Sequence, residues 1–299
     1  MGYLFVCFTG EQPDGEQIYF SVSKDGRKWE DLNQGNPVLR SGIGEKGVRD
    51  PFLVRHPRTN RYYLMATDLC IHAGKSWEEA QTHGSRDLIV WESDDLIHWS
   101  KERSCTVGVP QAGCVWAPEA IYDEERQAFF VFFASRICLP GDRQGKHRIY
   151  ATYTEDFRTF SDPFVYMDRE TDVIDTTIIQ TQGMFYRFSK DETHKRILLE
   201  KSKHLLGDFT PIDSELLKNL KGVEGPEIYL LPDQRTWCLI LDHFQEKKGY
   251  LPLLTDNLDS GIFQTAKEGV WDPGEKKKRH GGVLCIGAED YERLRNNYL

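Results

Sequence analysis

A four-strand unit recurs along this chain, and the repeat restricts the fold more than any other feature. Short apolar or alternating runs separated by Gly, Asp, Asn and Pro are typical of β-strands joined by turns. The first unit contains the candidate strands Asp50–Arg55, Tyr62–Thr67, Asp87–Glu92 and His98–Lys101. The second contains Pro118–Tyr122, Ala128–Ala134, Arg148–Tyr153 and Phe164–Met167. The third contains Asp175–Gln180, Met184–Ser189, Arg196–Lys201 and Phe209–Pro211. The fourth contains Pro226–Leu231, Thr236–Leu241, Tyr250–Thr255 and Ile262–Thr265. Four-stranded repeats of this kind predict the blades of a β-propeller.

A fifth unit is split between the two ends of the chain. Gly281–Ile286 has the pattern of a first strand, and the missing strands stand at Tyr3–Thr9, Gln17–Val22 and Lys28–Leu32. Joining them in one sheet closes the ring, removes exposed sheet edges and ties down both termini. We therefore predict an all-β, five-bladed β-propeller, a single domain over residues 1–299, whose last blade is closed by N-terminal strands pairing with the C-terminal strand. A β-sandwich with irregular insertions is the alternative, and the regular four-strand spacing argues against it. The longest helical pattern is Glu289–Asn297.

Composition narrows the function classes. The 299 residues are enough for a large core, and the 12% of aromatic residues favours strands. The net charge of −9 argues against a nucleic-acid partner. No long apolar run predicts a membrane-spanning helix or a signal peptide, so we expect a cytoplasmic protein with no membrane partner, although a trimmed signal would leave the same sequence. The seven cysteines are odd in number and form no CxxC pair, so we expect reduced, mostly buried thiols rather than a zinc site.

Acidic residues stand where the predicted inner strands begin. In a propeller the first strand of each blade lines the central channel, and these strands open onto one face. Acids are rarely buried unless they are paired or used in function. Proline is tolerated at the first residue of a strand, and Pro51, Pro118 and Pro226 stand at such positions. The five predicted starts carry Asp50, Glu119, Asp175, Glu224 and His280.

Asp50, Asp175 and Glu224 together suit hydrolysis of a glycosidic bond. One carboxylate has to activate water, and one carboxylic acid has to protonate the leaving oxygen. A third carboxylate beside the acid raises its pKa, so that it keeps its proton near neutral pH. The sequence therefore predicts a base, an acid and a modulator in one pocket.

A set of motifs in order resembles glycoside hydrolase family 43 over nearly the whole chain. The motifs are VRDPF at 48–52, YYLMATDL at 62–69, WAPE at 116–119, DTT at 175–177, EGPE at 224–227 and RHGGV at 279–283. The resemblance implies a five-bladed propeller, in agreement with the repeat count. It implies that Asp50 is the general base, Asp175 the pKa modulator that also orients the acid, and Glu224 the general acid. The implied mechanism is inversion, with base and acid carboxyls about 6.5–9.5 Å apart.

The same resemblance implies further site residues and no required cofactor. Trp116 would stack on a sugar or form part of the channel wall, and Glu119 and Asp68 would contact substrate hydroxyls or support neighbouring structure. Arg49 and Arg279 are expected at the substrate site, in salt bridges with the catalytic acids. His280 matches a channel histidine that in some relatives reaches a calcium or sodium ion through water, and Gly282 stands where those relatives often have Ser. The insertion Cys70–Arg86, with His72 and Trp77, is expected to wall one side of the pocket.

The expected partner is an oligosaccharide substrate, and the sequence leaves the oligomeric state open. Of the activities in the family, we favour an exo-acting α-L-arabinofuranosidase, with β-xylosidase or arabinan- and galactan-active enzymes as alternatives. A retaining fructan hydrolase would share the Arg-Asp-Pro motif, but its upstream Asn-Asp-Pro motif does not occur before residue 49. A non-catalytic carbohydrate- or protein-binding propeller is the alternative from another class, since fold does not determine function.

Overall fold

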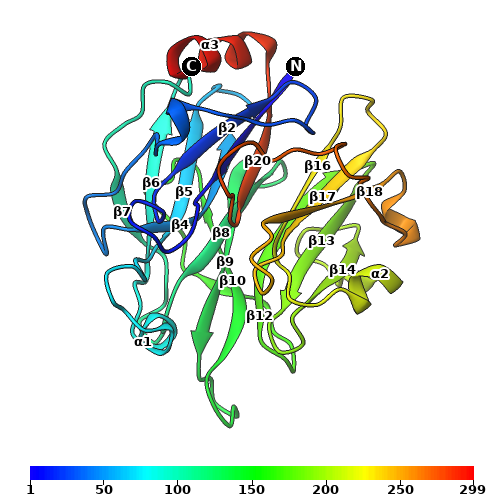
Figure 1. Cartoon of the computed structure of the whole chain (residues 1–299). Helices are drawn as coiled ribbons and strands as arrows, with labels where there is room; N and C mark the ends of the chain where they lie inside the picture. Colours follow the sequence, from blue (N-terminus) through cyan, green and yellow to red (C-terminus); the bar gives the residue numbers. More distant parts are fainter.

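Twenty strands form five antiparallel sheets of four strands each, arranged around a central channel (Figure 1). The computed structural model describes all 299 residues. The first sheet contains β4 (Val48–Arg55), β5 (Tyr62–Asp68), β6 (Asp87–Ser93) and β7 (Arg103–Thr106). The second contains β8 (Trp116–Asp123), β9 (Ala128–Ile137), β10 (Lys146–Thr154) and β11 (Phe164–Met167). The third contains β12 (Val173–Thr181), β13 (Met184–Asp191), β14 (Arg196–Ser202) and β15 (Thr210–Pro211). The fourth contains β16 (Glu224–Leu230), β17 (Trp237–Asp242), β18 (Tyr250–Thr255) and β19 (Gln264–Thr265).

The fifth sheet joins the two ends of the chain. Its order is β20 (Gly281–Ile286), β1 (Gly2–Cys7), β2 (Tyr19–Ser23) and β3 (Glu30–Asp31). Strands β1 and β20 pair antiparallel from Gly2 opposite Ile286 to Cys7 opposite Gly281. The inner strands β4, β8, β12, β16 and β20 contact one another in a closed ring. The predicted five-bladed propeller, closed by its termini, is confirmed.

The core is divided among the interfaces between neighbouring blades. Five separate clusters of buried apolar side chains each combine residues of two adjacent sheets. Alternation along each strand explains this, because side chains on the two faces of a sheet pack against different neighbours. Pairs that share a cluster include Leu4 and Leu64, Met65 and Val131, Phe132 and Ile178, Phe188 and Leu239, and Phe5 and Ile240.

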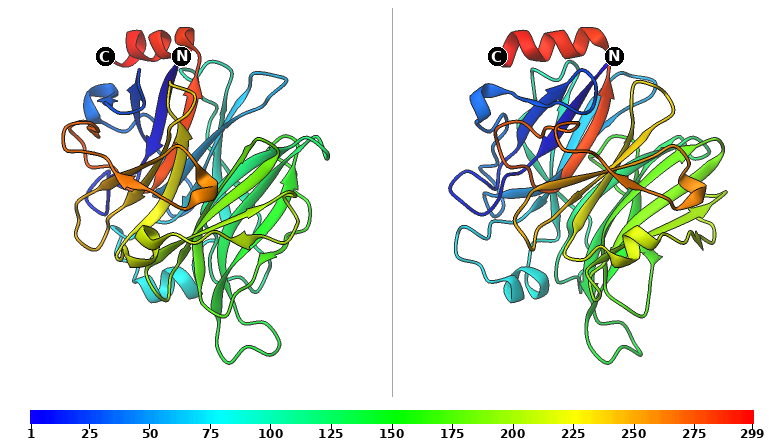
Figure 2. Two further views of the ribbon diagram at one scale, coloured as in Figure 1. Left: turned by 90° about the vertical axis from the view of Figure 1, so that its right-hand side faces the viewer. Right: turned by 45° about the vertical axis from the view of Figure 1, so that its right-hand side comes forward.

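Three short α-helices and two 3₁₀ turns connect or flank the blades. They are α1 (Trp77–Thr82), α2 (Glu215–Asn219), α3 (Ala288–Tyr298), η1 (Asn33–Gly35) and η2 (Leu258–Ser260). The predicted C-terminal helix is present as α3, which buries Tyr291 and Leu294. Helix α3 lies beside the two termini, at the end of the molecule opposite α1 (Figure 2). Helix α1 begins with a capping box between Ser76 and Glu79, which anchors it within the predicted insertion.

One local strand prediction is wrong. The outer strand of the first sheet is β7, not His98–Lys101, because the Asp95 carboxylate accepts hydrogen bonds from the Ile97 and His98 N–H groups and holds that segment in a bend. All seven cysteines are free, and four of them are buried, in agreement with the expectation of mostly buried thiols, while Cys138 and Cys285 are exposed. No helix is both long enough and apolar enough to cross a membrane.

Candidate active site

Four of the five inner strands carry a β-bulge, and these bulges form the mouth of the channel. The register shifts lie between Arg49 and Phe52, Trp116 and Glu119, Ile174 and Thr176, and Glu224 and Glu227. One residue in each bulge has a positive φ, namely Asp50 (48°), Ala117 (46°), Asp175 (44°) and Gly225 (53°). For a residue with a Cβ this conformation costs about 1–2 kcal/mol. Bulges re-aim side chains next to active sites, and here they turn two of the predicted acids into the mouth.

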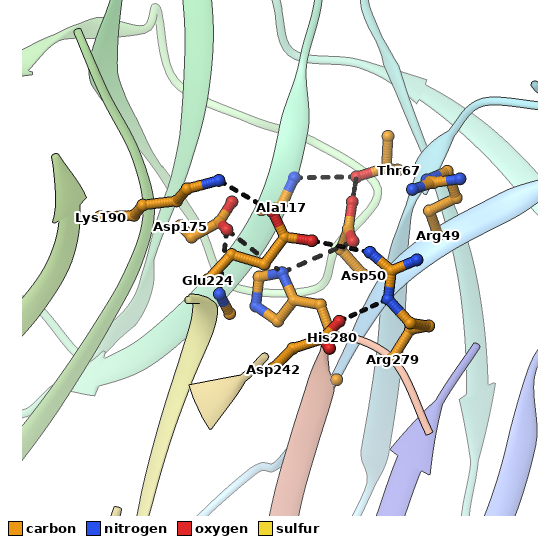
Figure 3. Close-up of polar contacts among 12 residues, drawn as sticks. Arg49, Asp50, Thr67, Ala117, Asp175, Lys190, Glu224, Asp242, Arg279 and His280 are labelled. Carbon is orange, nitrogen blue, oxygen red and sulfur yellow. Dashed lines mark hydrogen bonds and ion pairs between the residues drawn. The ribbon is translucent and has the colours of Figure 1, made fainter. Parts of the chain in front are cut away.

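The three predicted catalytic carboxyls line one cavity of about 750 Å³. Asp50, Asp175 and Glu224 come from β4, β12 and β16, and Figure 3 shows their side chains converging on His280 and Arg279. Trp77 and Gln81 of α1 also line this cavity, so it opens at the end of the propeller away from α3. Three acids from remote parts of the chain therefore share one pocket, as the motif positions predict.

Asp50 is held as an ionised carboxylate. Its Oδ2 accepts a hydrogen bond from the Thr67 hydroxyl at 3.2 Å, and the Thr67 oxygen accepts one from the Ala117 N–H at 2.8 Å (Figure 3). Its Oδ1 lies 3.5 Å from Nδ1 of His280. Burial alone would raise the pKa of Asp50, but the hydrogen bond and charge of His280, with Arg49 and Thr67, lower it overall.

Asp175 and His280 are the next pair in the mouth. Asp175 Oδ2 accepts a hydrogen bond from the Gly225 N–H at 3.0 Å and lies 3.9 Å from His280 Nδ1. Burial raises the pKa of Asp175 to about 6, although His280 and Lys190 oppose that shift. Burial favours the neutral imidazole, yet Asp175 and Asp50 together raise the pKa of His280 to about 9. His280 is therefore a buried cation between two carboxyl groups.

Glu224 is clamped by two cations. Lys190 Nζ lies 2.8 Å from Glu224 Oε2, and Arg279 Nη2 lies 2.7 Å from Oε1 (Figure 3). The Nε of Arg279 also pairs with Asp242. Burial would raise the pKa of Glu224, but Lys190 and Arg279 lower it overall. In the free protein this carboxyl is an ionised acceptor on both oxygens.

The other predicted site residues are only partly in the pocket. Trp116, Arg49, Arg279 and His280 line it. Trp116 stacks on His147 with ring centroids 5.3 Å apart and meets Trp77 edge-on at 6.1 Å, so it is part of an aromatic wall. Arg279 pairs with Glu224 as expected.

Arg49 differs from its expected pairing. It forms salt bridges with Glu16 at 2.8 Å and Glu11 at 3.3 Å rather than with a catalytic acid. Those partners lie in the loop after β1, which is outside all of the motifs that predicted the site.

Glu119 and Asp68 lie outside the pocket wall. The strand position equivalent to Asp50 is Ala117, so the prediction that Glu119 occupies a matched start is wrong. Glu119 is only 4% exposed, and its Oε2 has no hydrogen-bond partner. Burial, with Glu227 as a further cause, raises its pKa well above the usual range. Asp68 is buried and accepts a hydrogen bond from the Glu45 N–H at 2.8 Å, so it holds the preceding loop.

Sequence reasoning missed Lys190, Asp242 and Thr67. Lys190 is the penultimate residue of β13, Asp242 ends β17, and Thr67 lies near the end of β5. The predicted catalytic residues all lie near the starts of inner strands, whereas the ends of second strands reach the same mouth because neighbouring strands are antiparallel. Polar residues at the ends of second strands would have been the signal.

The structure contains no group of three or more His, Cys, Asp or Glu side chains placed to hold a metal ion. The ring of His280 faces Asp50 and Asp175, and its raised pKa favours the protonated form, which cannot coordinate a cation. These residues do not fit direct coordination. The water-mediated calcium or sodium ion stays a prediction.

The fold and the site define this chain as a five-bladed propeller with a three-carboxyl pocket, the architecture of a glycosidase domain. Residues 1–292 match the model of a glycosyl hydrolase family 43-related group, described as a probable glycosyl hydrolase domain. The chain belongs to this family.

Similar proteins agree with this membership. An α-L-arabinofuranosidase of Bifidobacterium longum subsp. longum is 30% identical over an alignment 313 residues long, which covers 91% of this chain. The alignment spans only 29% of that relative's length.

Solved structures share the fold. A family 43 β-1,3-galactosidase superposes with a TM-score of 0.60 at 12% identity, covering 89% of this chain and 90% of the other. A family 43 protein of Bacillus licheniformis superposes with a TM-score of 0.59 at 15% identity, covering 94% of this chain and 54% of the other. The catalytic domain of a family 62 α-L-arabinofuranosidase of Coprinopsis cinerea superposes with a TM-score of 0.55 at 13% identity, covering 82% of this chain and 75% of the other.

Proposed function

We propose that this domain is an inverting, exo-acting α-L-arabinofuranosidase that releases terminal arabinose from oligosaccharides. The convergence of Asp50, Asp175 and Glu224 in one cavity carries the proposal. Family membership supports glycosidic hydrolysis, and the relative named α-L-arabinofuranosidase supports the sugar.

Asp50 is the general base. Its lowered pKa keeps it ionised at neutral pH, and the Thr67 hydroxyl donates a hydrogen bond that holds one of its oxygens in place. Asp50 takes a proton from a water molecule as that water attacks the anomeric carbon. The glycosidic bond breaks on the opposite side of the sugar, so the configuration inverts.

Glu224 is the general acid, and Asp175 is its modulator. Glu224 delivers its proton to the leaving oxygen as the bond to the anomeric carbon breaks. Asp175 accepts a hydrogen bond from the N–H of Gly225, the residue after Glu224, and so positions the acid. The negative charge of Asp175 also raises the proton affinity of Glu224.

The cavity walls favour a terminal sugar. Its volume of about 750 Å³ falls in the range of small-ligand pockets. Trp77, 47% exposed on α1, and Trp116 present apolar ring surface on which a sugar can stack. The insertion that carries α1 narrows the mouth, which favours removal of one residue from a chain end.

Hydrolysis of 4-nitrophenyl α-L-arabinofuranoside, with the first-formed anomer followed by NMR, tests the proposal. We expect release of β-arabinofuranose as the first product. The β-xyloside, the galactofuranoside, and linear and branched arabinan complete the panel. Preference for the xyloside would correct the sugar, first formation of the α-anomer would contradict inversion, and no turnover of any sugar would favour a binding propeller.

A further inference from the structure

Lys190 is a buried cation in the wall of the active-site cavity. Only 2% of its side chain is exposed, and its Nζ lies over the Phe244 ring, 4.5 Å from the centroid. A buried ammonium is stable only when it is paired. Lys190 has two carboxylate partners at nearly equal distance, Glu224 at 2.8 Å and Glu192 at 2.7 Å.

Each cation on Glu224 also serves a second carboxylate. Arg279 pairs with Asp242, and Lys190 pairs with Glu192. A cation shared between two anions stabilises each less than it would stabilise one alone, because the anions repel each other. Asp242 is fully buried, whereas Glu192 lines the cavity. A bound substrate can therefore change how the charge of Lys190 is shared between Glu224 and Glu192.

A general acid has to be protonated before it reacts, yet in the free site both oxygens of Glu224 accept from cations. We propose that Lys190 is a positioning residue for the reaction, an inference that rests on the function proposed above. Lys190 holds the Glu224 carboxyl toward the leaving oxygen, and Glu192 draws part of the lysine's charge away so that Glu224 can carry a proton.

Lys190 itself transfers no proton. The proton leaves Glu224 for the glycosidic oxygen, and the proton of the attacking water passes to Asp50. The charged groups facing Glu224 from the surrounding elements set how tightly it holds that proton. They are Lys190 on β13, Glu192 after it, Asp175 on β12, Asp50 on β4, Asp242 on β17, and Arg279 and His280 just before β20.

The test is the pH dependence of kcat/KM for Lys190→Met and Glu192→Gln. The substrate is phenyl α-L-arabinofuranoside, whose poor leaving group needs the acid. Without the lysine charge, Glu224 stays protonated to higher pH, so the basic limb of the Lys190→Met profile should move up by about one pH unit. Without Glu192, Lys190 acts on Glu224 alone, so the basic limb of Glu192→Gln should move down by about half a unit.

Two further variants make the test specific. Lys201→Met removes an equivalent charge in the same blade, where Lys201 pairs with Asp259 at 2.8 Å away from the cavity, and should leave the profile unchanged. Lys190→Arg keeps the charge and should restore the wild-type limb. If Lys190 and Glu192 had only a structural role, Lys190→Met and Glu192→Gln would lower the rate. They would not move the basic limb of the pH profile in opposite directions.

A ¹³C-carboxyl NMR titration of Glu224, assigned through Glu224→Gln, should show the same order of midpoints without any substrate. Shifts in the same direction for Lys190→Met and Glu192→Gln, or no shift in an active protein, would overturn the inference. If Lys190→Met does not fold, Glu192→Gln alone decides. A wild-type protein inactive on every glycoside would instead defeat the proposed function, so the two failures are distinguishable.

Discussion

Two layers of carboxyl groups lie on the inner strands of the propeller, in different electrostatic surroundings. The mouth layer, Asp50, Asp175 and Glu224, faces the cations of His280, Lys190 and Arg279. The inner layer, Glu119 and Glu227, lies two residues beyond the positive-φ positions Ala117 and Gly225. Glu227 accepts a hydrogen bond from the Val283 N–H at 2.7 Å, and neither inner carboxyl has a salt bridge.

Burial raises the carboxyl pKa values in both layers, but only the mouth layer has adjacent cations that oppose this effect. Burial raises the pKa of Glu227 to about 8, and the more distant charge of His280 only partly opposes it. In the mouth, adjacent cations overcome the same burial and lower the pKa of Asp50 and Glu224. Burial alone keeps a carboxyl neutral, whereas a paired cation holds it ionised, as a general base requires.

The largest expected effect comes from Asp50→Asn in the mouth layer. Removal of the base should reduce kcat by about 10³-fold or more for every glycoside, because no leaving group compensates for an unactivated water. Steady-state rates on phenyl and 2,4-dinitrophenyl arabinofuranosides measure this, with circular dichroism as the folding control. A rate within threefold of wild type would place water activation on another group.

Glu224→Gln should separate the acid from the base. The phenyl glycoside should lose about 10²–10⁴-fold in kcat, while the 2,4-dinitrophenyl glycoside, whose leaving group needs no proton, should lose far less. Rates on the same two substrates check the ratio. Equal losses on both would contradict the acid role of Glu224 and direct attention to Asp175.

Glu227→Gln in the inner layer should change the pH dependence of the free energy of unfolding rather than the rate of hydrolysis. The native pKa of about 8 lies above the ordinary value of 4.5, so the folded protein binds more protons than the unfolded chain between these pH values. Wild-type stability therefore falls as the pH rises through this window. The variant, which has no such proton, should match wild type at pH 5 and exceed it by about 2 kcal/mol at pH 9.

Denaturant unfolding at the two pH values measures this difference. Glu125→Gln, on an exposed turn, serves as the matched control and should show no pH-dependent gain. A Glu227→Gln variant that is equally destabilised at both pH values would show that the inner carboxyl is ionised in the native protein.

The smallest expected effect comes from Trp77→Ala at the rim of the mouth. Loss of one stacking surface should raise KM for arabino-oligosaccharides about three- to tenfold and leave kcat nearly unchanged. Leu206→Ala, another exposed apolar side chain, is the control. An unchanged KM would remove α1 from the substrate site.

Sequence patterns alone predicted the repeat, the split fifth blade and the carboxyls at the mouth. These follow from strand alternation, turn residues and motif order, which are local properties that a chain displays without its neighbours. The same local signals correctly indicated helix α3 and the insertion that walls the pocket.

Which charged groups lie next to one another could be seen only in the folded chain. The bulge placed Ala117 rather than Glu119 at the mouth, Arg49 paired with Glu16, and Lys190 reached Glu224 from another blade. Proton affinity depends on burial and on charges within a few ångströms, and residues remote in the chain supply them. For that reason the sequence could name the acids, while the fold determined which of them is ionised.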